Sequence, residues 1–287
     1  MKGRPIKILS TLLISLTAFL LILAETNAIE TKVFRVSDGR TISFKKMIDD
    51  LKKVNLVFLG ETHDRQSHHV IQLNIIKALN ASKIPLAVGL EMFTVESQRD
   101  LDEWVAGTLP LENFIKIYYK NWGFPWPLYR DIFLYIRDNK ISAIGLNIPI
   151  EISQKVATSG FSSLTKKERE KLPPEVGCAV DEKYMSFIRR AYAMHGNMNK
   201  EFLYFCEAQL LWDQVMARNL IEFLKKNPEK TVVVLTGNGH AWKRGIPEHV
   251  KNLSSKTSYR VILPEILHQI DPGNISIEDT DYIFLQE

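Results

Sequence analysis

Residues 57–64 read VFLGETHD, and residues 234–241 read VLTGNGHA. Each stretch is a continuous apolar run that ends in a glycine, and a histidine, His63 or His240, follows three residues after that glycine. A continuous apolar run indicates a strand covered on both faces, as in a parallel sheet. Glycine at the end of a strand permits a sharp turn and leaves room for a ligand. We therefore expect a parallel sheet in which two similar strand ends each present an imidazole.

Five β-rich runs alternate with helical patterns along the chain. The runs occupy residues 54–60, 84–91, 141–147, 230–237 and 259–265. Between runs, residues 64–80 and 212–226 place apolar side chains at helical spacing. This alternation predicts an α/β fold with a mostly parallel central sheet flanked by helices. Residues from about 150 to 205 have no strand pattern, and we expect a smaller helical insertion or cap there. The polar tail, residues 270–287, is expected to form a final hairpin.

The first 28 residues have the pattern of a secretory signal peptide. They combine a cationic start, an apolar run from Ile8 to Leu23 and a small-residue cleavage site at Ala28. The alternative is an uncleaved anchor, because the run approaches the ~17 residues that can span a bilayer. We expect cleavage, export to the periplasm or the extracellular space, and one mature α/β domain from 29 to 287. No cysteine follows the run, so we expect a signal peptide without a lipidation site.

The charge of the chain gives no argument for nucleic-acid binding. The formal net charge is +4, and the expected signal segment contributes three of the cations. The second half contains no basic stripe interleaved with aromatic residues of the kind that nucleic-acid-binding surfaces use. We therefore expect a small-molecule ligand and no nucleic-acid partner.

Ionisable residues follow three of the predicted strands. Glu61 and His63 follow the first, Glu91 ends the second, and His240 follows the fourth. Ligands of open parallel sheets bind outside the carboxyl ends of the strands, where these residues would meet. Two imidazoles with carboxylates suit a zinc, manganese or ferrous ion, and they also suit a general base with an orienting acid. We predict one polar site: Glu61, His63, Glu91 and His240 are its catalytic candidates, and His63, Glu91 and His240 are its metal-ligand candidates.

Each of these residues also has a structural alternative, in which the GETH segment caps the next helix and the GNGH segment is only a tight turn. His68 and His69 fall early in the predicted helix, and we expect them on a solvated face. Asp213 lies in an apolar helical pattern, so its carboxylate needs a partner. That partner is either a histidine of the site, which Asp213 would orient, or an arginine, with Arg99 and Arg218 as candidates.

Aromatic residues concentrate between Phe114 and Tyr135. This stretch of 22 residues contains nine of them, which indicates either core beneath a loop or a wall for a flat apolar ligand. In the second interpretation a tyrosine such as Tyr118, Tyr119 or Tyr129 would lie within reach of a metal centre, because phenolate oxygen can ligate haem iron. Tyr129 is therefore a candidate for contact with a cofactor, and Asp213 of the apolar helical pattern is another.

Six motifs together resemble the ChaN-like family, which is grouped with the Tiki, TraB and erythromycin-esterase proteins. They are LGETHD (59–64), GLEMF (89–93), LDEWVAGTL (101–109), GLNIP (145–149), AQLLWDQVMA (208–217) and GNGHAWKRGIPEHV (237–250). The resemblance implies an α/β domain with a smaller helical part. It also implies that the two GxxH segments and the strand-end glutamates face one cavity. His195 falls where the family often has a histidine, which makes it a further candidate for cofactor contact.

The resemblance leaves two functions open. ChaN-like proteins are exported, iron-linked proteins associated with haem, which a tyrosine holds at a dimer interface, so the resemblance implies haem binding, a homodimer and association with the cell envelope. Tiki-type and erythromycin-esterase relatives imply instead a hydrolase, here a protease or esterase with a divalent ion such as zinc or manganese. The chain contains no G-x-S-x-G nucleophile motif. We take an exported haem- or iron-binding uptake protein as the first hypothesis and a metal-dependent hydrolase as the alternative, and whether the protein is an enzyme stays open.

Overall fold

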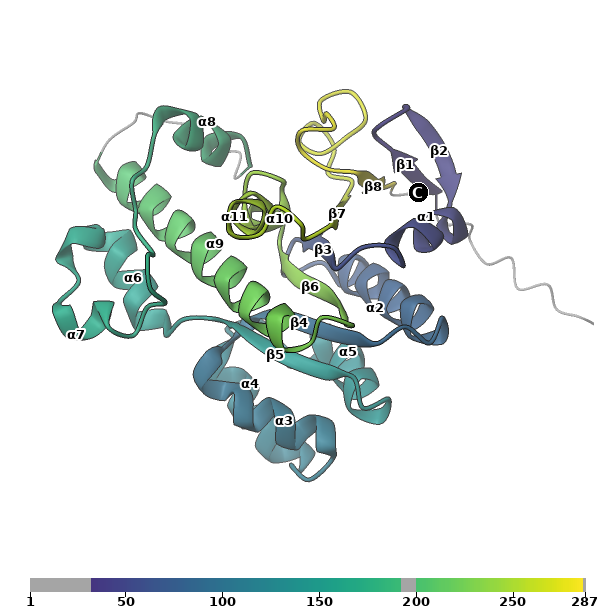
Figure 1. Ribbon diagram of the computed structural model, residues 1–287, viewed down its shortest axis with the longest axis horizontal. Helices are drawn as coiled ribbons and strands as arrows, with labels where there is room; N and C mark the ends of the chain where they lie inside the picture. The colour runs from purple at the N-terminus through teal and green to yellow at the C-terminus, as the bar shows by residue number, and fades with distance from the viewer. Residues whose placement is uncertain (1–31, 192–199, 286–287) are drawn as a thin grey trace, which may run out of the picture. The chain divides into compact units, whose positions relative to one another are not determined.

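An eight-stranded sheet organises the computed structural model, which describes residues 32–191 and 200–285 (Figure 1). The order of the strands across the sheet is β2-β1-β8-β7-β3-β6-β4-β5. From β8 to β5 all neighbours are parallel, whereas β1 is antiparallel to both β2 and β8. The strands are β1 (Lys32–Arg35), β2 (Arg40–Ser43), β3 (Leu56–Glu61), β4 (Leu86–Thr94), β5 (Ser142–Asn147), β6 (Thr231–Gly237), β7 (Tyr259–Pro264) and β8 (Tyr282–Phe284).

Helices connect these strands. In the first half they are α1 (Phe44–Leu51), α2 (Gln66–Ala81), η1 (Val95–Ser97), α3 (Gln98–Ala106), α4 (Leu111–Asn121) and α5 (Trp126–Asp138). In the second half they are α6 (Ile150–Ser159), η2 (Phe161–Ser163), α7 (Lys166–Arg169), α8 (Glu182–Ala191), α9 (Lys200–Lys226), α10 (Asn238–Ala241) and α11 (Ile246–Leu253). No helix among the described residues is long and apolar enough to cross a membrane.

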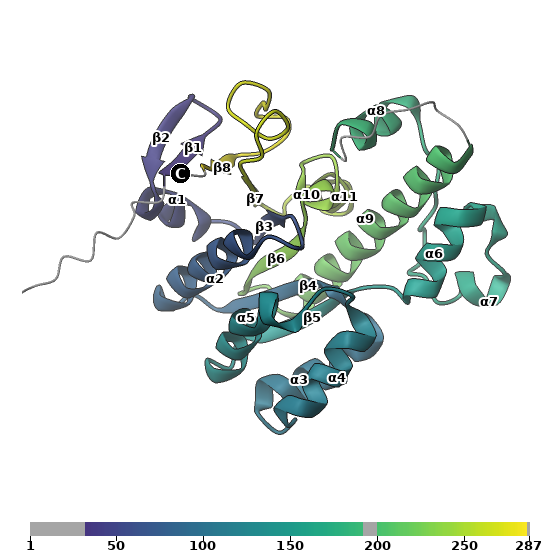
Figure 2. The same ribbon diagram turned by 180° about the vertical axis from the view of Figure 1, so that it is seen from behind.

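Alternating strand residues supply two separate cores, one on each face of the sheet. On β3, Val57 and Leu59 pack with helices α1 to α5, whereas Leu56 and Phe58 pack with α8, α9 and α11. Side chains of a strand point alternately to opposite faces, so a continuous apolar run is what a doubly covered strand requires. The long helix α9 crosses one face in Figure 1, and α2 and α5 cover the other in Figure 2.

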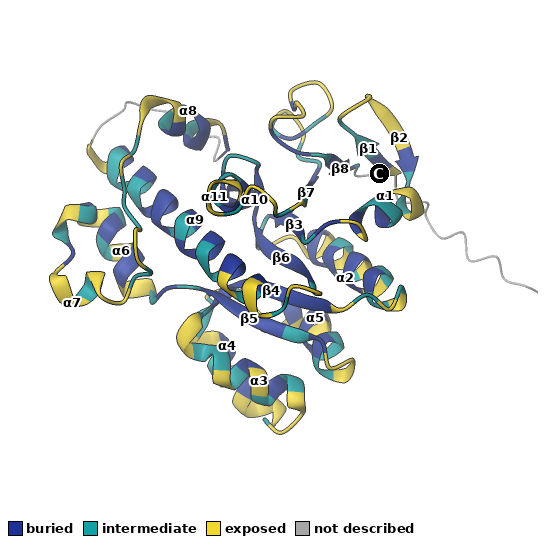
Figure 3. Ribbon diagram, viewed as in Figure 1, coloured by how far each residue is buried: buried dark blue, intermediate teal, exposed yellow. Residues whose placement is uncertain are grey.

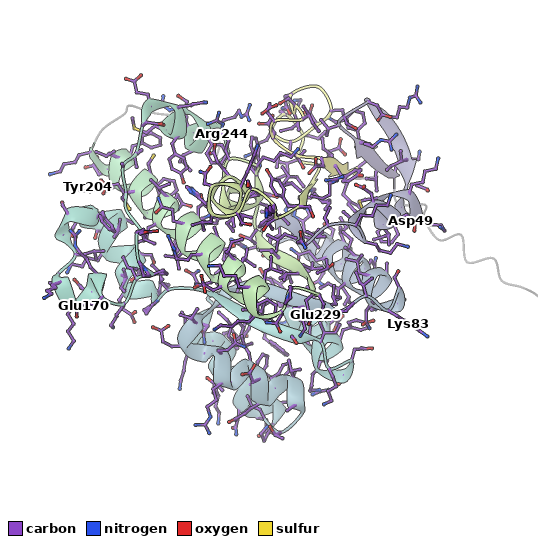
Figure 4. The ribbon with its side chains drawn as sticks, in the orientation of Figure 1. Asp49, Lys83, Glu170, Tyr204, Glu229 and Arg244 are labelled. Atoms are coloured by element: carbon purple, nitrogen blue, oxygen red, sulfur yellow. The ribbon has the colours of Figure 1, made fainter. Side chains whose placement is uncertain are left out.

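The burial pattern follows from this layering. The central strands β3 and β6 are buried along their whole length, and Figure 3 shows them dark blue between partly exposed helices. Charged side chains such as Lys83, Glu170 and Glu229 are exposed, and Lys83 and Glu170 lie at the edge of the molecule in Figure 4. The sheet is thus apolar along its central strands, with exposed charged side chains on the outer surface.

The predicted fold class is confirmed, since all five predicted strands exist and the sheet that they form is parallel. The predicted final hairpin is wrong. Residues 282–284 form the single strand β8, which pairs in parallel with β7 and antiparallel with β1. The β1 and β2 pair was not predicted, because four-residue strands give too short a pattern to separate from a loop. The expected signal peptide and His195 lie outside the described residues.

An irregularity in β4 places Glu91 at the sheet edge. The pairing of β4 with β5 shifts register between Leu90 and Thr94, so the intervening residues bulge from the ladder. Asn147 donates a hydrogen bond from its Nδ2 to the carbonyl oxygen of Glu91, at 2.9 Å, which holds the bulge. A β-carbon at Gly145 would lie only 2.3 Å from the carbonyl oxygen of Thr94. Glycine at position 145 therefore permits the bulge.

Substitution of Gly145 by alanine tests this requirement. We expect Gly145→Ala to lower the free energy of unfolding by about 1–3 kcal/mol, the usual cost of overpacking a filled interior. Urea unfolding measures the change. Gly177→Ala is the control, because a β-carbon there meets no atom within 4 Å and we expect a change below about 0.5 kcal/mol. Equal stability of the two variants would contradict this account of the bulge.

Candidate functional site

A cavity of about 870 Å³ opens at the carboxyl ends of the parallel strands. His63 after β3, Glu91 in β4, Asn147 at the end of β5 and His240 after β6 all line it. The two GxxH segments also touch. Asn238 donates from its Nδ2 to the Oγ1 of Thr62, at 3.3 Å, so the second segment is bonded to the first. The expectation that two distant segments meet at one cavity is confirmed.

The carboxylate of Glu61 holds the imidazole of His63. The Nδ1 of His63 lies 2.8 Å from the Oε1 of Glu61. The hydroxyl of Tyr129 donates to the same oxygen, and Gln72 donates from its Nε2 to the Oε2 at 2.8 Å. The Nε2 of His69 lies 3.4 Å from that second oxygen. Both oxygens of a carboxylate that is 2% exposed are therefore surrounded by donors.

This environment keeps Glu61 ionised. Burial alone would raise its pKa, but the imidazoles of His63 and His69 outweigh burial, and the pKa lies well below its ordinary range. Burial and the nearby charge of Glu61 raise the pKa of Tyr129, so the phenol keeps the proton that it donates. For His63, burial lowers the pKa, but the carboxylates of Glu61 and Glu91 raise it by more than burial lowers it. The net pKa of His63 is therefore above its ordinary value.

Helix α2 supplies three of the groups around the GETH segment. His68 and His69 are 2% and 1% exposed, so the expectation that they lie on a solvated face is wrong. The Nδ1 of His68 accepts the backbone N–H of Thr62 at 2.9 Å. The buried face of α2 continues through Gln72, Ile75, Ile76 and Leu79. The helical spacing of those apolar residues, extended back toward the start of α2, reaches the two histidines, and this signal could have located them.

A second carboxylate holds His240 in the same manner. The Nδ1 of His240 lies 2.7 Å from the Oδ1 of Asp213, and the hydroxyl of Tyr184 donates to the Oδ2 of Asp213 at 3.0 Å. Asp213 thus has a site histidine as its partner. The arginines considered as alternatives pair elsewhere: Arg99 with Glu103 and Arg218 with Glu175. Burial lowers the pKa of His240, but the charges of Asp213 and Glu91 outweigh it and the net pKa is raised.

The two histidines therefore have matching surroundings. Each imidazole directs Nδ1 at a buried carboxylate, and each carboxylate also accepts the hydroxyl of a tyrosine, Tyr129 or Tyr184. A carboxylate at Nδ1 fixes the tautomer of the ring. For His63, whose side chain is 26% exposed, Nε2 is then the nitrogen that a molecule in the cavity can reach. Sequence reasoning missed Tyr184, because a tyrosine in an amphipathic helix such as α8 has no distinguishing pattern.

Glu91 lies between the two histidines. Its Oε2 accepts the hydroxyl of Thr236 at 2.5 Å and the backbone N–H of Gly237 at 2.6 Å. Its Oε1 lies 3.8 Å from the Nε2 of His240. A β-carbon at Gly237 would lie 3.1 Å from the Nε2 of His63 and 3.8 Å from the Oε2 of Glu91. Glycine at position 237 therefore lets the ring of His63 approach β6 and the carboxylate of Glu91.

The aromatic stretch supplies both core and cavity wall. Tyr118 and Tyr129 are fully buried, and Trp122 and Phe124 line the cavity. The ring centroids of Trp122 and Phe124 each lie 4.9 Å from that of His63. Trp212 stands edge-on to His240, with ring centroids 5.6 Å apart. Each histidine of the cavity is thus flanked by a tryptophan that also lines the cavity.

The predicted site residues separate into two groups. The cavity is lined by Glu61, His63, Glu91 and His240. Tyr129 and Asp213 do not line it; Tyr129 is hydrogen-bonded to Glu61, and Asp213 to His240. Among residues 32–191 and 200–285, no three His, Cys, Asp or Glu side chains are placed to hold a metal ion. Metal ligation by His63, Glu91 and His240 therefore stays a prediction. The arrangement presents two oriented imidazoles, which would suit either a ligand to iron or proton transfer to a bound molecule.

Substitution of Asp213 by asparagine tests the source of the raised pKa of His240. Asparagine keeps an acceptor at Nδ1 but removes the charge, so we expect the pKa of His240 to fall, as NMR titration of its ring would show. A pKa that is raised on folding stabilises the fold below the unfolded value of about 6.5, and this stabilisation is lost as the pH rises through the folded value. Asp213→Asn should therefore destabilise more at about pH 5.5 than at about pH 8.5. An unchanged pKa of His240 would contradict the assignment.

Comparisons with known proteins agree with this architecture. A solved structure of ChaN of Campylobacter jejuni with cofacial heme binding is 22% identical to this chain, the match covers 88% of this chain and 95% of that one, and the TM-score is 0.69. A mutant of the erythromycin esterase EreC in its open conformation is 13% identical, with 82% and 76% coverage and a TM-score of 0.50. A succinoglycan biosynthesis protein is also 13% identical, with 84% and 89% coverage and a TM-score of 0.50.

At these identities the likeness to solved structures shows the fold alone. No curated protein matches the chain. A family model described as haem-binding uptake, Tiki superfamily, ChaN matches residues 47–250, a range that contains both GxxH segments, Glu91 and Asp213. Because this match spans more than half of the chain, the protein belongs to the ChaN family of haem-binding uptake proteins in the Tiki superfamily.

Proposed function

We propose that this protein binds haem in the cavity at the carboxyl edge of the sheet, with the iron held by the Nε2 of His63. The observation that carries the proposal is the setting of His63: its Nδ1 is bonded to Glu61, its ring lies against Trp122 and Phe124, and its side chain is 26% exposed to the cavity. Membership of the ChaN family and the haem named for the Campylobacter ChaN support the choice of ligand.

The size and lining of the cavity fit a haem. Its volume of about 870 Å³ falls in the range of about 300–1,000 Å³ that is usual for sites of small molecules and cofactors. Apolar side chains form much of its wall, as a porphyrin ring requires; they include Met92, Ile117, Trp122, Phe124, Ile148 and Trp212. When bound, haem would supply its iron as the group that accepts a protein ligand.

A carboxylate-held imidazole is the best-oriented iron ligand that the described lining offers. None of the described residues that line the cavity is a tyrosine or a cysteine. Tyr129 donates its hydroxyl to Glu61 and is fully buried. A histidine whose Nδ1–H is held by a carboxylate is a stronger ligand through Nε2. His240 has the same arrangement at Nδ1, but its side chain is only 5% exposed, so His63 is the more accessible of the two.

Export to the cell envelope is part of the proposal, and it is supported by the signal-peptide pattern of residues 1–28. A homodimer is a further part, for which the family resemblance is the support. We do not propose the hydrolase as a second function. The erythromycin esterase is only 13% identical to this chain, so its similarity concerns the fold alone. The described residues also contain no group of three side chains placed to hold a divalent ion.

Hemin titration of the purified protein tests the proposal. We expect a saturable shift of the Soret band with the wild type. His63→Ala should weaken binding at least about tenfold, which corresponds to about 1.4 kcal/mol, and should change the spectrum because the iron loses a ligand. His268→Ala is the matched control, since His268 is exposed and does not line the cavity, and it should bind hemin as the wild type does.

Two results would contradict the proposal. Absence of a saturable Soret shift in the wild type would overturn haem binding itself. Equal affinity and equal spectra for His63→Ala and His268→Ala would overturn the assignment of His63 as the iron ligand.

A further inference from the structure

Helix α2 turns a polar face toward the end of β3. His68, His69 and Gln72 lie in its first two turns and are each no more than 2% exposed. All three are directed at the GETH segment: His68 at the backbone of Thr62, and His69 and Gln72 at the carboxylate of Glu61. Of the three, His68 and Gln72 form hydrogen bonds to the segment, as buried polar side chains generally must. This face of α2 therefore serves the segment that carries His63.

Of these three α2 residues, His68 makes the contact that lies closest in sequence to His63. Its Nδ1 accepts the N–H of Thr62, the residue between Glu61 and His63, at 2.9 Å. Burial lowers the pKa of His68 to about 4, so the ring is neutral at physiological pH and Nδ1 keeps the lone pair that an acceptor needs.

This contact does not cap helix α2 itself. The N-cap of α2 is Arg65, which makes no side-chain cap hydrogen bond. The bond from Thr62 to His68 instead ties the strand-end segment to the helix, beside the bonds of Glu61 to His63, Gln72 and Tyr129. With the backbone held at Thr62 and the carboxylate held at Glu61, the ring of His63 has both of its attachments fixed.

We propose that His68 is a positioning residue for His63: by accepting the N–H of Thr62, it fixes the GETH segment so that the Nδ1 of His63 rests on Glu61 and its Nε2 faces the cavity. The effect on haem rests on the proposed function, whereas the effect on the geometry of His63 does not. Gln72 has a parallel role through the Oε2 of Glu61.

Three variants separate positioning from general stability. His68→Leu keeps the side-chain bulk but removes the acceptor. His68→Asn keeps an acceptor, because its Oδ1 can occupy the place of the Nδ1 of histidine. Asn74→Leu is the matched control, since Asn74 is exposed on the same helix.

The first readout needs no haem. In the uniformly 15N-labelled wild type, we expect the Nδ1–H proton of His63 as a slowly exchanging downfield NMR signal. We also expect a 15N–15N coupling across the hydrogen bond between Thr62 and His68. His68→Leu should lose the slow exchange of the His63 signal, and His68→Asn and Asn74→Leu should retain it. An absent coupling in the folded wild type would overturn the proposal even if no leucine variant folds.

The second readout is hemin binding. His68→Leu should bind hemin about 10–100-fold more weakly, the usual cost of losing a group that orients a metal ligand. His68→Asn should recover most of the affinity and the wild-type spectrum. A folded His68→Leu that keeps both the His63 signal and the hemin affinity would overturn the proposal, as would a folded His68→Asn that fails as His68→Leu does. Failure of the wild type to bind hemin would overturn the proposed function, and the NMR signals would still decide the role of His68.

Discussion

The buried carboxylate of Glu61 is the interaction on which the site depends. Burying an ion costs several kcal/mol of free energy unless hydrogen-bond donors surround it. This cost is comparable to the net free energy of unfolding of a whole domain. Here the donors come from separate parts of the chain: His63 from the strand end, Gln72 from α2 and Tyr129 from α5. The anion therefore joins a strand and two helices, and misplacement of any one of them would leave a charge without its partners.

The second carboxylate, Asp213, repeats this arrangement from the opposite face of the sheet. It lies on α9 and binds His240, with Tyr184 of α8 as its second donor. The strands that carry the two histidines, β3 and β6, are neighbours in register, with Glu61 opposite Gly237. Each imidazole is thus oriented from its own side of the sheet, and both reach one cavity. Glu91 of β4 lies between them and adds a charge that raises the pKa of both rings.

Much of the fold could be predicted from sequence because its strands are buried on both faces. Such strands are continuous apolar runs, and their ends at Gly60 and Gly237 are marked by glycine. The rule that parallel strands present ligands at their carboxyl ends then brings His63, Glu91 and His240 together without knowledge of any contact. The strands β1, β2 and β8 are only three or four residues long, which is too short for such a run to stand out from a loop. β1 and β2 pair with each other, and this pair joins the sheet only through β8, a partner distant in the chain that a local pattern does not contain.

The residues that sequence reasoning misplaced, His68 and His69, show where the local argument fails. A polar residue at the start of a helix is usually solvated, because most helix termini lie at the surface. Helix α2 begins instead directly behind the edge of the sheet, so its first turns pack against the functional segment and its later turns against the core. The same helix face is polar where it meets the ionised Glu61 and apolar where it meets the strands. Polarity alone therefore assigned these histidines to solvent, whereas the continuous spacing of 68, 69, 72, 75, 76 and 79 assigns them to the interior.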